Sequence, residues 1–166
     1  MNTLTRMAGA LAAGALALLS LAACDEQRIR ELEEDVSTEA DVRARFGEPE
    51  RVWPESDGGH TLEYNRQPAG HQNYMITIGP AGKMTALRQV LAPHYFEQVQ
   101  PGMPQDAVRR LLGQPAKTTP YALKQETDWD WNWIDPPSRR MIFTASFGPD
   151  GRVKRSGSME KLHDGP

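Results

Sequence analysis

The sequence has a single cysteine, Cys24, among 166 residues, so the folded chain contains no internal disulfide. It also has no basic block: the net charge is −3, and Lys and Arg are scattered among Asp and Glu. A protein that binds nucleic acid usually gathers its cations on one face or in one run. We therefore expect a domain stabilised by packing, with no nucleic-acid partner.

Motifs for catalysis and metal binding are missing as well. The four histidines show no ligand spacing such as His-x-x-x-His, and the sequence has no Gly-x-Ser-x-Gly elbow. Gly58-Gly59 is typical of a turn and not of a phosphate-binding loop. Asp128 and Asp130 share one face of a predicted strand, without a recognisable acid–base partner. The sequence predicts no enzyme activity, no catalytic residue, no metal and no cofactor. The histidines are His60, His71, His94 and His163.

The N-terminus carries the pattern of a bacterial lipoprotein signal. Arg6 provides a positive start, and the uncharged run from Ala8 to Leu19 is too short for a spanning helix. Leu21-Ala22-Ala23-Cys24 then forms a lipobox, which predicts cleavage between Ala23 and Cys24, removal of residues 1–23 and acylation of Cys24. Acyl chains on Cys24 would hold the protein at a membrane. The alternative is an ordinary secretory signal in which the cysteine is incidental.

The residues after the lipobox bear on which membrane is used. Asp25 follows the cysteine, and an acidic residue there is typical of lipoproteins retained in the inner membrane of enteric bacteria. Residues 24–36 are strongly charged and predict a tether facing the periplasm, with only Ile29, Leu32 and Val36 forming an apolar stripe. The choice between inner and outer membrane stays open.

The chain contains an internal repeat. Ala40 to Pro49 (Ala-Asp-Val-Arg-Ala-Arg-Phe-Gly-Glu-Pro) is matched by Asp106 to Pro115 (Asp-Ala-Val-Arg-Arg-Leu-Leu-Gly-Gln-Pro). A second landmark, Gly79 to Met84, is matched in the same order by Gly148 to Val153. Two matches in order indicate a tandem duplication, with a first unit over 37–91 and a second over 95–160.

Each landmark has a structural reason. Thr38 is expected to cap a helix and Pro104 to stand at the first helical position of its counterpart, while Gly47 and Gly113 allow a turn with positive φ after each helix. Pro-x-Gly in the second landmark predicts a hairpin. Period-two segments surround that hairpin, so each unit predicts a helix followed by about three antiparallel strands. The expected fold class is α+β, with helices on one face of a sheet that the two units can share.

The second unit resembles a known family. Val99-Gln100-Pro101-Gly102-Met103-Pro104, followed by Val108 to Pro115, resembles the Gly-Met to Leu-Gly-x-Pro segment of the SmpA/OmlA (BamE-like) lipoproteins. The resemblance implies a lipid-anchored α+β protein of the outer membrane that binds envelope proteins of the β-barrel assembly machine. Paired units imply a likeness to the β-lactamase inhibitor protein fold. The first unit departs from the motif, with Val36-Ser37 in place of Gly-Met.

The candidate partner-binding residues lie in and after a tryptophan-rich strand. Alternation in Asp128 to Trp133 places Trp129, Trp131 and Trp133 on one face, where they form either a binding surface or part of the core. Trp133 is expected to be exposed, because its counterpart in the first unit is Arg66. Arg139-Arg140 in the following turn is a further candidate contact.

The sequence as a whole predicts a non-enzymatic protein-binding module tethered at Cys24. Two alternatives stay open. One is an inhibitor-like module that blocks an envelope enzyme through its sheet face. The other is a small hydrolase or ligand-binding protein with a site that the sequence does not reveal.

Overall fold

The computed structural model describes residues 29–161. The predicted signal peptide, its cleavage point, Cys24 and the first part of the tether lie outside the described residues. Among the described helices, none has the length and apolar character needed to cross a membrane.

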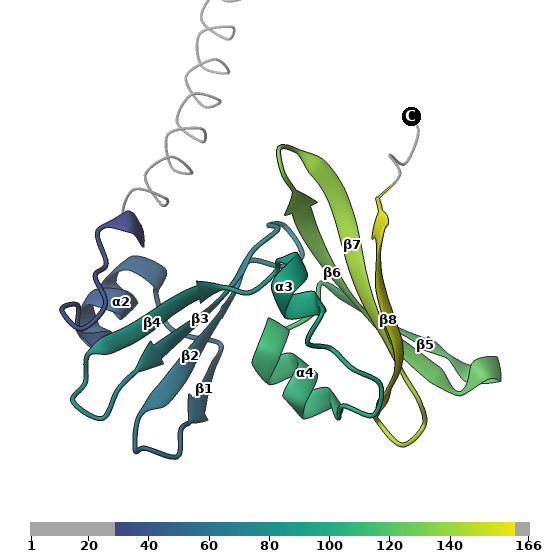
Figure 1. Ribbon diagram of the computed structural model, residues 1–166, viewed down its shortest axis with the longest axis horizontal. Coiled ribbons are helices and arrows are strands. Elements are labelled where there is room, and N and C mark those ends of the chain that lie inside the picture. Colours follow the sequence, from purple (N-terminus) through teal and green to yellow (C-terminus); the bar gives the residue numbers. More distant parts are fainter. Residues whose placement is uncertain (1–28, 162–166) are drawn as a thin grey trace, which may run out of the picture.

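The first half, residues 29–91, pairs one helix with a four-stranded antiparallel sheet in the order β1-β2-β3-β4 (Figure 1). Thr38 caps the helix as predicted: its hydroxyl accepts from the Asp41 N–H, and the Asp41 carboxylate accepts from the Thr38 N–H. Val42 and Phe46 then pack onto one face of the sheet. The elements are α2 (Glu39–Phe46), β1 (Arg51–Pro54), β2 (His60–Asn65), β3 (Asn73–Ile78) and β4 (Met84–Gln89).

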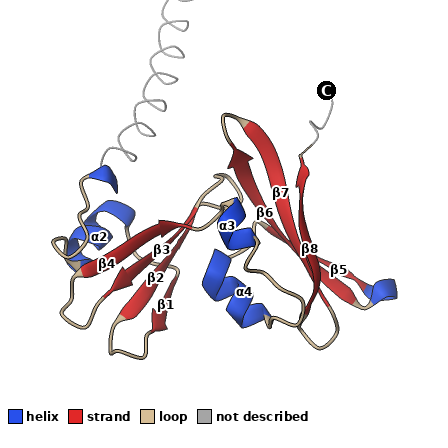
Figure 2. Ribbon diagram, in the orientation of Figure 1, coloured by secondary structure: helices blue, strands red, loops and turns tan. Residues whose placement is uncertain are grey.

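The second half repeats this plan and adds a short helix before it. Its sheet has the order β5-β6-β7-β8, again antiparallel throughout, as Figure 2 shows in red. Pro104 is the N-cap residue and not the first helical residue, since the helix begins at Gln105. The elements are α3 (Pro93–Phe96), α4 (Gln105–Leu112), β5 (Lys117–Tyr121), η1 (Ala122–Lys124), β6 (Glu126–Asp135), β7 (Arg139–Phe147) and β8 (Val153–Glu160).

The two halves correspond in their strand registers. Arg51 lies opposite Glu63 in the first sheet, and Lys117 lies opposite Asp130 in the second. A register shift follows Thr77 between β3 and β4, and the same shift follows Ser146 between β7 and β8. This correspondence is compatible with the predicted tandem arrangement, and it assigns each residue of one sheet a counterpart in the other.

The helix ends correspond in the same way. Gly47 and Gly113 both have positive φ, 82° and 76°, as predicted for the residue after each helix. The Tyr64 hydroxyl donates to the Gly47 carbonyl at 3.0 Å, and Trp131 Nε1 donates to the Gly113 carbonyl at 3.1 Å. An aromatic side chain of the sheet therefore fixes the end of the helix in each half.

Three details of the predicted fold are wrong. Each half has four strands and not three, because β1 and β5 pair as edge strands. The halves form two separate sheets and not one shared sheet. The helices do not all cover one face, since α4 lies between the two sheets (Figure 1). The prediction missed β5, in which Pro120 lowers strand propensity, although an edge strand tolerates a proline.

Helix α4 contacts both sheets with different sides. Val108 and Leu112 are buried in the core of the second half, together with aromatic residues of β6 and β7. Arg109 faces the first half instead and pairs with Glu63 at 3.2 Å. Asn73, fully buried in β3, donates from its side-chain amide to the Leu112 carbonyl at 2.8 Å. These bonds join the two halves through α4.

Candidate protein-binding groove

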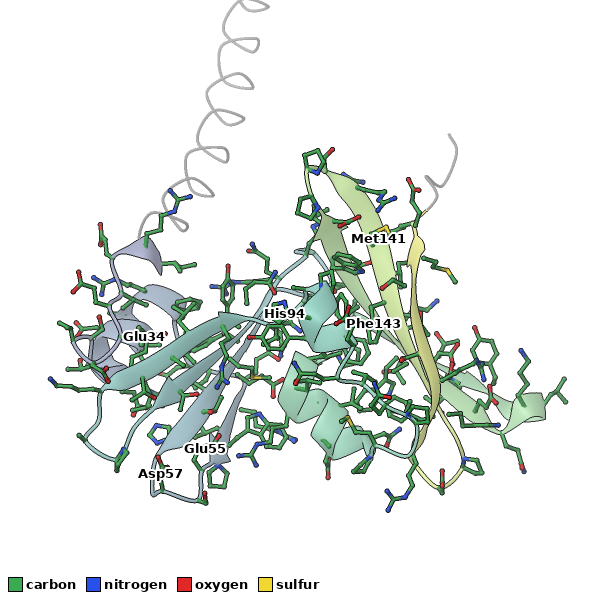
Figure 3. All side chains as sticks on the ribbon, in the orientation of Figure 1. Glu34, Glu55, Asp57, His94, Met141 and Phe143 are labelled. Carbon is green, nitrogen blue, oxygen red and sulfur yellow. The ribbon has the colours of Figure 1, made fainter. Side chains whose placement is uncertain are left out.

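The β6–β7 hairpin is longer than its counterpart in the first half and extends past the short helix α3. Since α3 covers only part of this sheet face, a groove of about 820 Å³ remains beside it. Figure 3 labels Phe143 on β7, whose ring stacks on Phe96 of α3 with 4.3 Å between ring centroids. The apolar wall of the groove comprises Phe96, Val99, Trp133, Met141 and Phe143.

Trp133 is the chemically unusual member of this wall. Its ring meets Phe96 edge-on, with centroids 5.1 Å apart, and only 4% of the residue is exposed. Its indole Nε1 is buried and has no hydrogen-bond partner among the described residues. A buried donor without an acceptor costs about 1–3 kcal/mol. The wall is therefore apolar with one unsatisfied donor.

The rim of the groove is charged. Arg139 forms an ion pair with Asp135, and this hydrogen bond and charge raise the pKa of Arg139. Lys154 and Arg155 on β8 each lie 2.8 Å from a carboxylate oxygen of Glu126. Hydrogen bonds from Arg155 and then Lys154 lower the pKa of Glu126 to about 2, so that carboxylate stays ionised. The rim holds its cations in place by pairing them.

The structure separates the three predicted tryptophans. Trp131 is fully buried and belongs to the core, and Trp129 is partly buried against the same core. The prediction that Trp133 is exposed is wrong, because the residue is buried, although it lines the groove. It faces Phe96 of α3, whereas its counterpart Arg66 lies over the ring of Phe46.

The structure also separates the two predicted arginines. Arg139 lies at the groove rim, and Arg140 is exposed on β7 opposite Ile134. The groove therefore brings together Trp133 and Arg139. Partner contact by any of these tryptophans and arginines remains a prediction.

The sequence reading missed the contribution of α3. Phe96 and Val99 lie at the start of the predicted second unit, in a stretch for which no helix was predicted. Pro93 at the first helical turn, followed by Tyr95 and Phe96, is a usable helix signal. Met141 directly follows Arg139-Arg140 in the sequence, and its place in the groove depends on the path of α3.

The polar residues considered for chemistry do not converge on the groove. His60 contacts Glu39 of α2 at 2.9 Å, and the ring of His94 lies tilted against that of Tyr95 on α3. Asp128 and Asp130 line a separate hollow on the opposite face of the second sheet. Within residues 29–161, no three His, Cys, Asp or Glu side chains are grouped so as to hold a metal ion.

Comparison with known proteins does not identify a family for this chain. No protein-family model and no curated protein matches the chain. Among solved structures, a DUF4309 family protein (YjgB) from Bacillus subtilis is similar, at 19% sequence identity and a TM-score of 0.31. The match covers 79% of this chain and 83% of that one. The resemblance to SmpA/OmlA lipoproteins therefore stays a prediction from the sequence motif.

Proposed function

We propose that this chain is a lipoprotein of the bacterial envelope, anchored through Cys24, that binds other envelope proteins without catalysing a reaction. The observation that carries the proposal is the aromatic groove beside α3, with the unpartnered Nε1 of Trp133 in its wall. Buried aromatic anchors flanked by charged rims are typical of protein–protein contact sites. The lipobox supports the membrane location.

The groove chemistry defines the kind of segment that would bind. An aliphatic or aromatic side chain would fill the space between Phe96 and Met141. Arg139 and Lys154 at the rim are already paired with Asp135 and Glu126, so the rim adds no preference for a charged residue. The proposed ligand is therefore an apolar peptide segment.

The finer parts of the proposal come from the sequence resemblance. Two tandem BamE-like units would make the protein a relative of the SmpA/OmlA lipoproteins, and its partners would then belong to the β-barrel assembly machine in the outer membrane. Asp25 favours the inner membrane instead.

Two alternatives are each favoured by one observation. The inhibitor-like module is favoured by the uncovered face of the second sheet, which is hollowed around Asp128 and Asp130. A small-ligand-binding protein is favoured by the groove volume of about 820 Å³, which is within the range of ligand sites.

Cross-linking and co-purification of the tagged full-length lipoprotein from gently solubilised envelopes test the main proposal. Met141→Glu places a charge in the groove wall, and we expect at least a tenfold loss of the recovered partner. Met159→Glu is the matched control, because Met159 lies on the adjacent strand and lines the hollow on the other face. Equal recovery with both variants and the wild type would refute groove binding. Loss only with Met159→Glu would support the inhibitor-like alternative.

Membrane anchoring is tested separately. Cys24→Ser removes the acylated side chain, so we expect the protein to move from the membrane fraction to the soluble periplasmic fraction. In the wild-type protein, mass spectrometry of the mature N-terminus checks whether cleavage falls between Ala23 and Cys24. A Cys24→Ser protein that is processed and still sediments with membranes would show that the anchor is not lipid on this residue.

A further inference from the structure

The end of α4 is seated on the first sheet by a defined set of contacts. Glu63, fully buried, accepts from the Arg109 side chain at 3.2 Å and from the Gln114 N–H at 3.0 Å. Asn65 accepts from the same N–H at 2.9 Å. A Cβ on Gly113 would come within 2.5 Å of Asn65 Oδ1, so the backbone lies directly on the sheet. This is a helix end held by acceptors on a sheet face.

No helix within residues 29–161 lies on the counterpart face of the second sheet. By strand register, Asp130 corresponds to Glu63, Asn132 to Asn65, and Asp128 to Thr61. Asp128 and Asp130 line a hollow of about 490 Å³, together with Ile142, Thr144, Ser146 and Gly157. We refer to these six residues as the open face. The hollow on the second sheet occupies the position that corresponds to the α4 contact on the first sheet.

Helix α2 carries the same type of end as α4, but within residues 29–161 it contacts its own sheet and no second sheet. Arg43 precedes Gly47 as Arg109 precedes Gly113, and each glycine donates its N–H to the carbonyl of that arginine. A Cβ built on Gly47 meets no atom within 4 Å, in contrast to Gly113. The C-terminal end of α2 therefore resembles that of α4 but has no second sheet to dock on. The open face resembles the face that receives α4 but has no helix docked on it.

Where the end of α2 differs from the end of α4, the open face differs from the first sheet at the corresponding position. Leu111 of α4 lies with Thr61 and Met75 around the junction with the first sheet. Their counterparts are Arg45 on α2 and Asp128 on the open face, with Thr144 in place of Met75. The uncharged side chains at this junction would thus be replaced by an arginine on the helix and an aspartate on the sheet. Asp128 Oδ1 is buried and has no hydrogen-bond partner among the described residues, while Arg45 lies 3.6 Å from Glu31.

A second pair of positions changes together. Arg110 of α4 pairs with Glu55 at 2.8 Å, and neither charge has a charged counterpart. Ala44 stands at the position of Arg110, and Tyr121 stands at that of Glu55. A small residue would face an aromatic ring, so no charge would be left unpaired. One contact is lost, because Ile142 replaces the buried amide of Asn73.

We propose that the open face binds the C-terminal end of α2 from a second copy of this chain, in the manner in which the first sheet holds α4. Arg43 and Arg45 of one copy would meet Asp130 and Asp128 of the next. The two surfaces differ, so the contact is heterologous and joins copies head to tail. It uses the face opposite the groove and is independent of the proposed function.

Sedimentation of the full-length lipoprotein in mild detergent, over a range of protein concentrations, tests the proposal. The wild type is expected to form a concentration-dependent series of oligomers. Asp130→Arg removes the receiving face and Arg43→Glu removes the inserted helix end, so each variant alone is expected to bind itself at least tenfold more weakly. Glu160→Arg is the charge control, since alternation along β8 places it on the face opposite Met159.

Mixing the two variants gives the decisive result. The intact α2 of Asp130→Arg can dock on the intact open face of Arg43→Glu, so the mixture is expected to associate. The two reversed charges are also opposite in sign, so their contact can extend the series beyond a heterodimer. This recovery would also show that both variants fold. A wild type that stays monomeric, a mixture that stays monomeric, or association that survives both single substitutions would overturn the proposal. Capture of a different envelope protein through Asp130, with a monomeric wild type, would overturn it too.

Discussion

Replacement of Glu63 by Gln is expected to weaken the junction between the two halves. Glu63 is fully buried, and its two oxygens accept four hydrogen bonds. Oε2 accepts from Trp53 Nε1, and Oε1 accepts from donors of Asn65, Arg109 and Gln114. The carboxylate is therefore an acceptor on every side, and two of its donors belong to the other half of the chain.

The size of the effect follows from these contacts. A glutamine keeps one acceptor oxygen, and the best placement leaves its NH2 group facing the indole N–H of Trp53. That unsatisfied donor costs about 1–3 kcal/mol, and loss of the charge-assisted bond to Arg109 costs about 1.5–3 kcal/mol. Arg109 retains partial contact with solvent, which reduces the second figure. We expect the free energy of unfolding to fall by about 3 kcal/mol.

Equilibrium unfolding in urea of the unlipidated Cys24→Ser chain measures this change. With a slope of about 2 kcal/mol per molar urea, the midpoint should fall by about 1.5 M. Glu50→Gln is the matched control, because Glu50 is exposed and accepts one bond from Asn65, and its effect should stay within about 0.5 kcal/mol. A Glu63→Gln loss below about 1 kcal/mol would refute the view that this carboxylate joins the halves.

Two further predictions concern the helix ends and the acid limit of stability. Gly47→Ala is expected to cost about 1 kcal/mol from the positive φ alone, whereas Gly113→Ala should cost at least twice that, because its Cβ would collide with Asn65. Thermal denaturation of both variants measures the difference, and equal losses would contradict the close approach of Gly113. The pKa of Glu126 is lowered from 4.5 to about 2, so its contribution to stability is present above about pH 4.5 and is lost as the pH falls towards 2. Glu126→Gln should flatten stability against pH in that window, and an unchanged profile would show that its pairing with two cations of β8 contributes nothing.

The local features of the fold could be predicted because their causes lie within a few residues. Thr38 and Asp41 form a capping box by themselves, and Gly47 and Gly113 end their helices because L side chains disfavour positive φ. The hairpin at Gly82 follows from the same local preference. The repeat strengthened these predictions, because the same helix end and the same hairpin occur in both units.

The arrangement of the sheets depends on contacts between distant parts of the chain. Alternation along β6 predicts that Trp129, Trp131 and Trp133 share a face, but not whether that face meets helices or a partner. Trp131 is in the core because its indole N–H reaches the carbonyl of Gly113 at the end of α4. That contact requires the helix and the sheet to be packed already.

The sequence by itself determined both ends of α2, the C-terminal end of α4 and the hairpins, because each depends on neighbouring residues. Lipid attachment at Cys24 stays a prediction. Only the tertiary structure decided that α4 lies between two sheets, where Glu63 and Asn73 hold it. Only the tertiary structure produced the groove, because α3 is shorter than the β6–β7 hairpin beside it. Both features arise from packing between segments far apart in the chain, which residue patterns along one segment do not record.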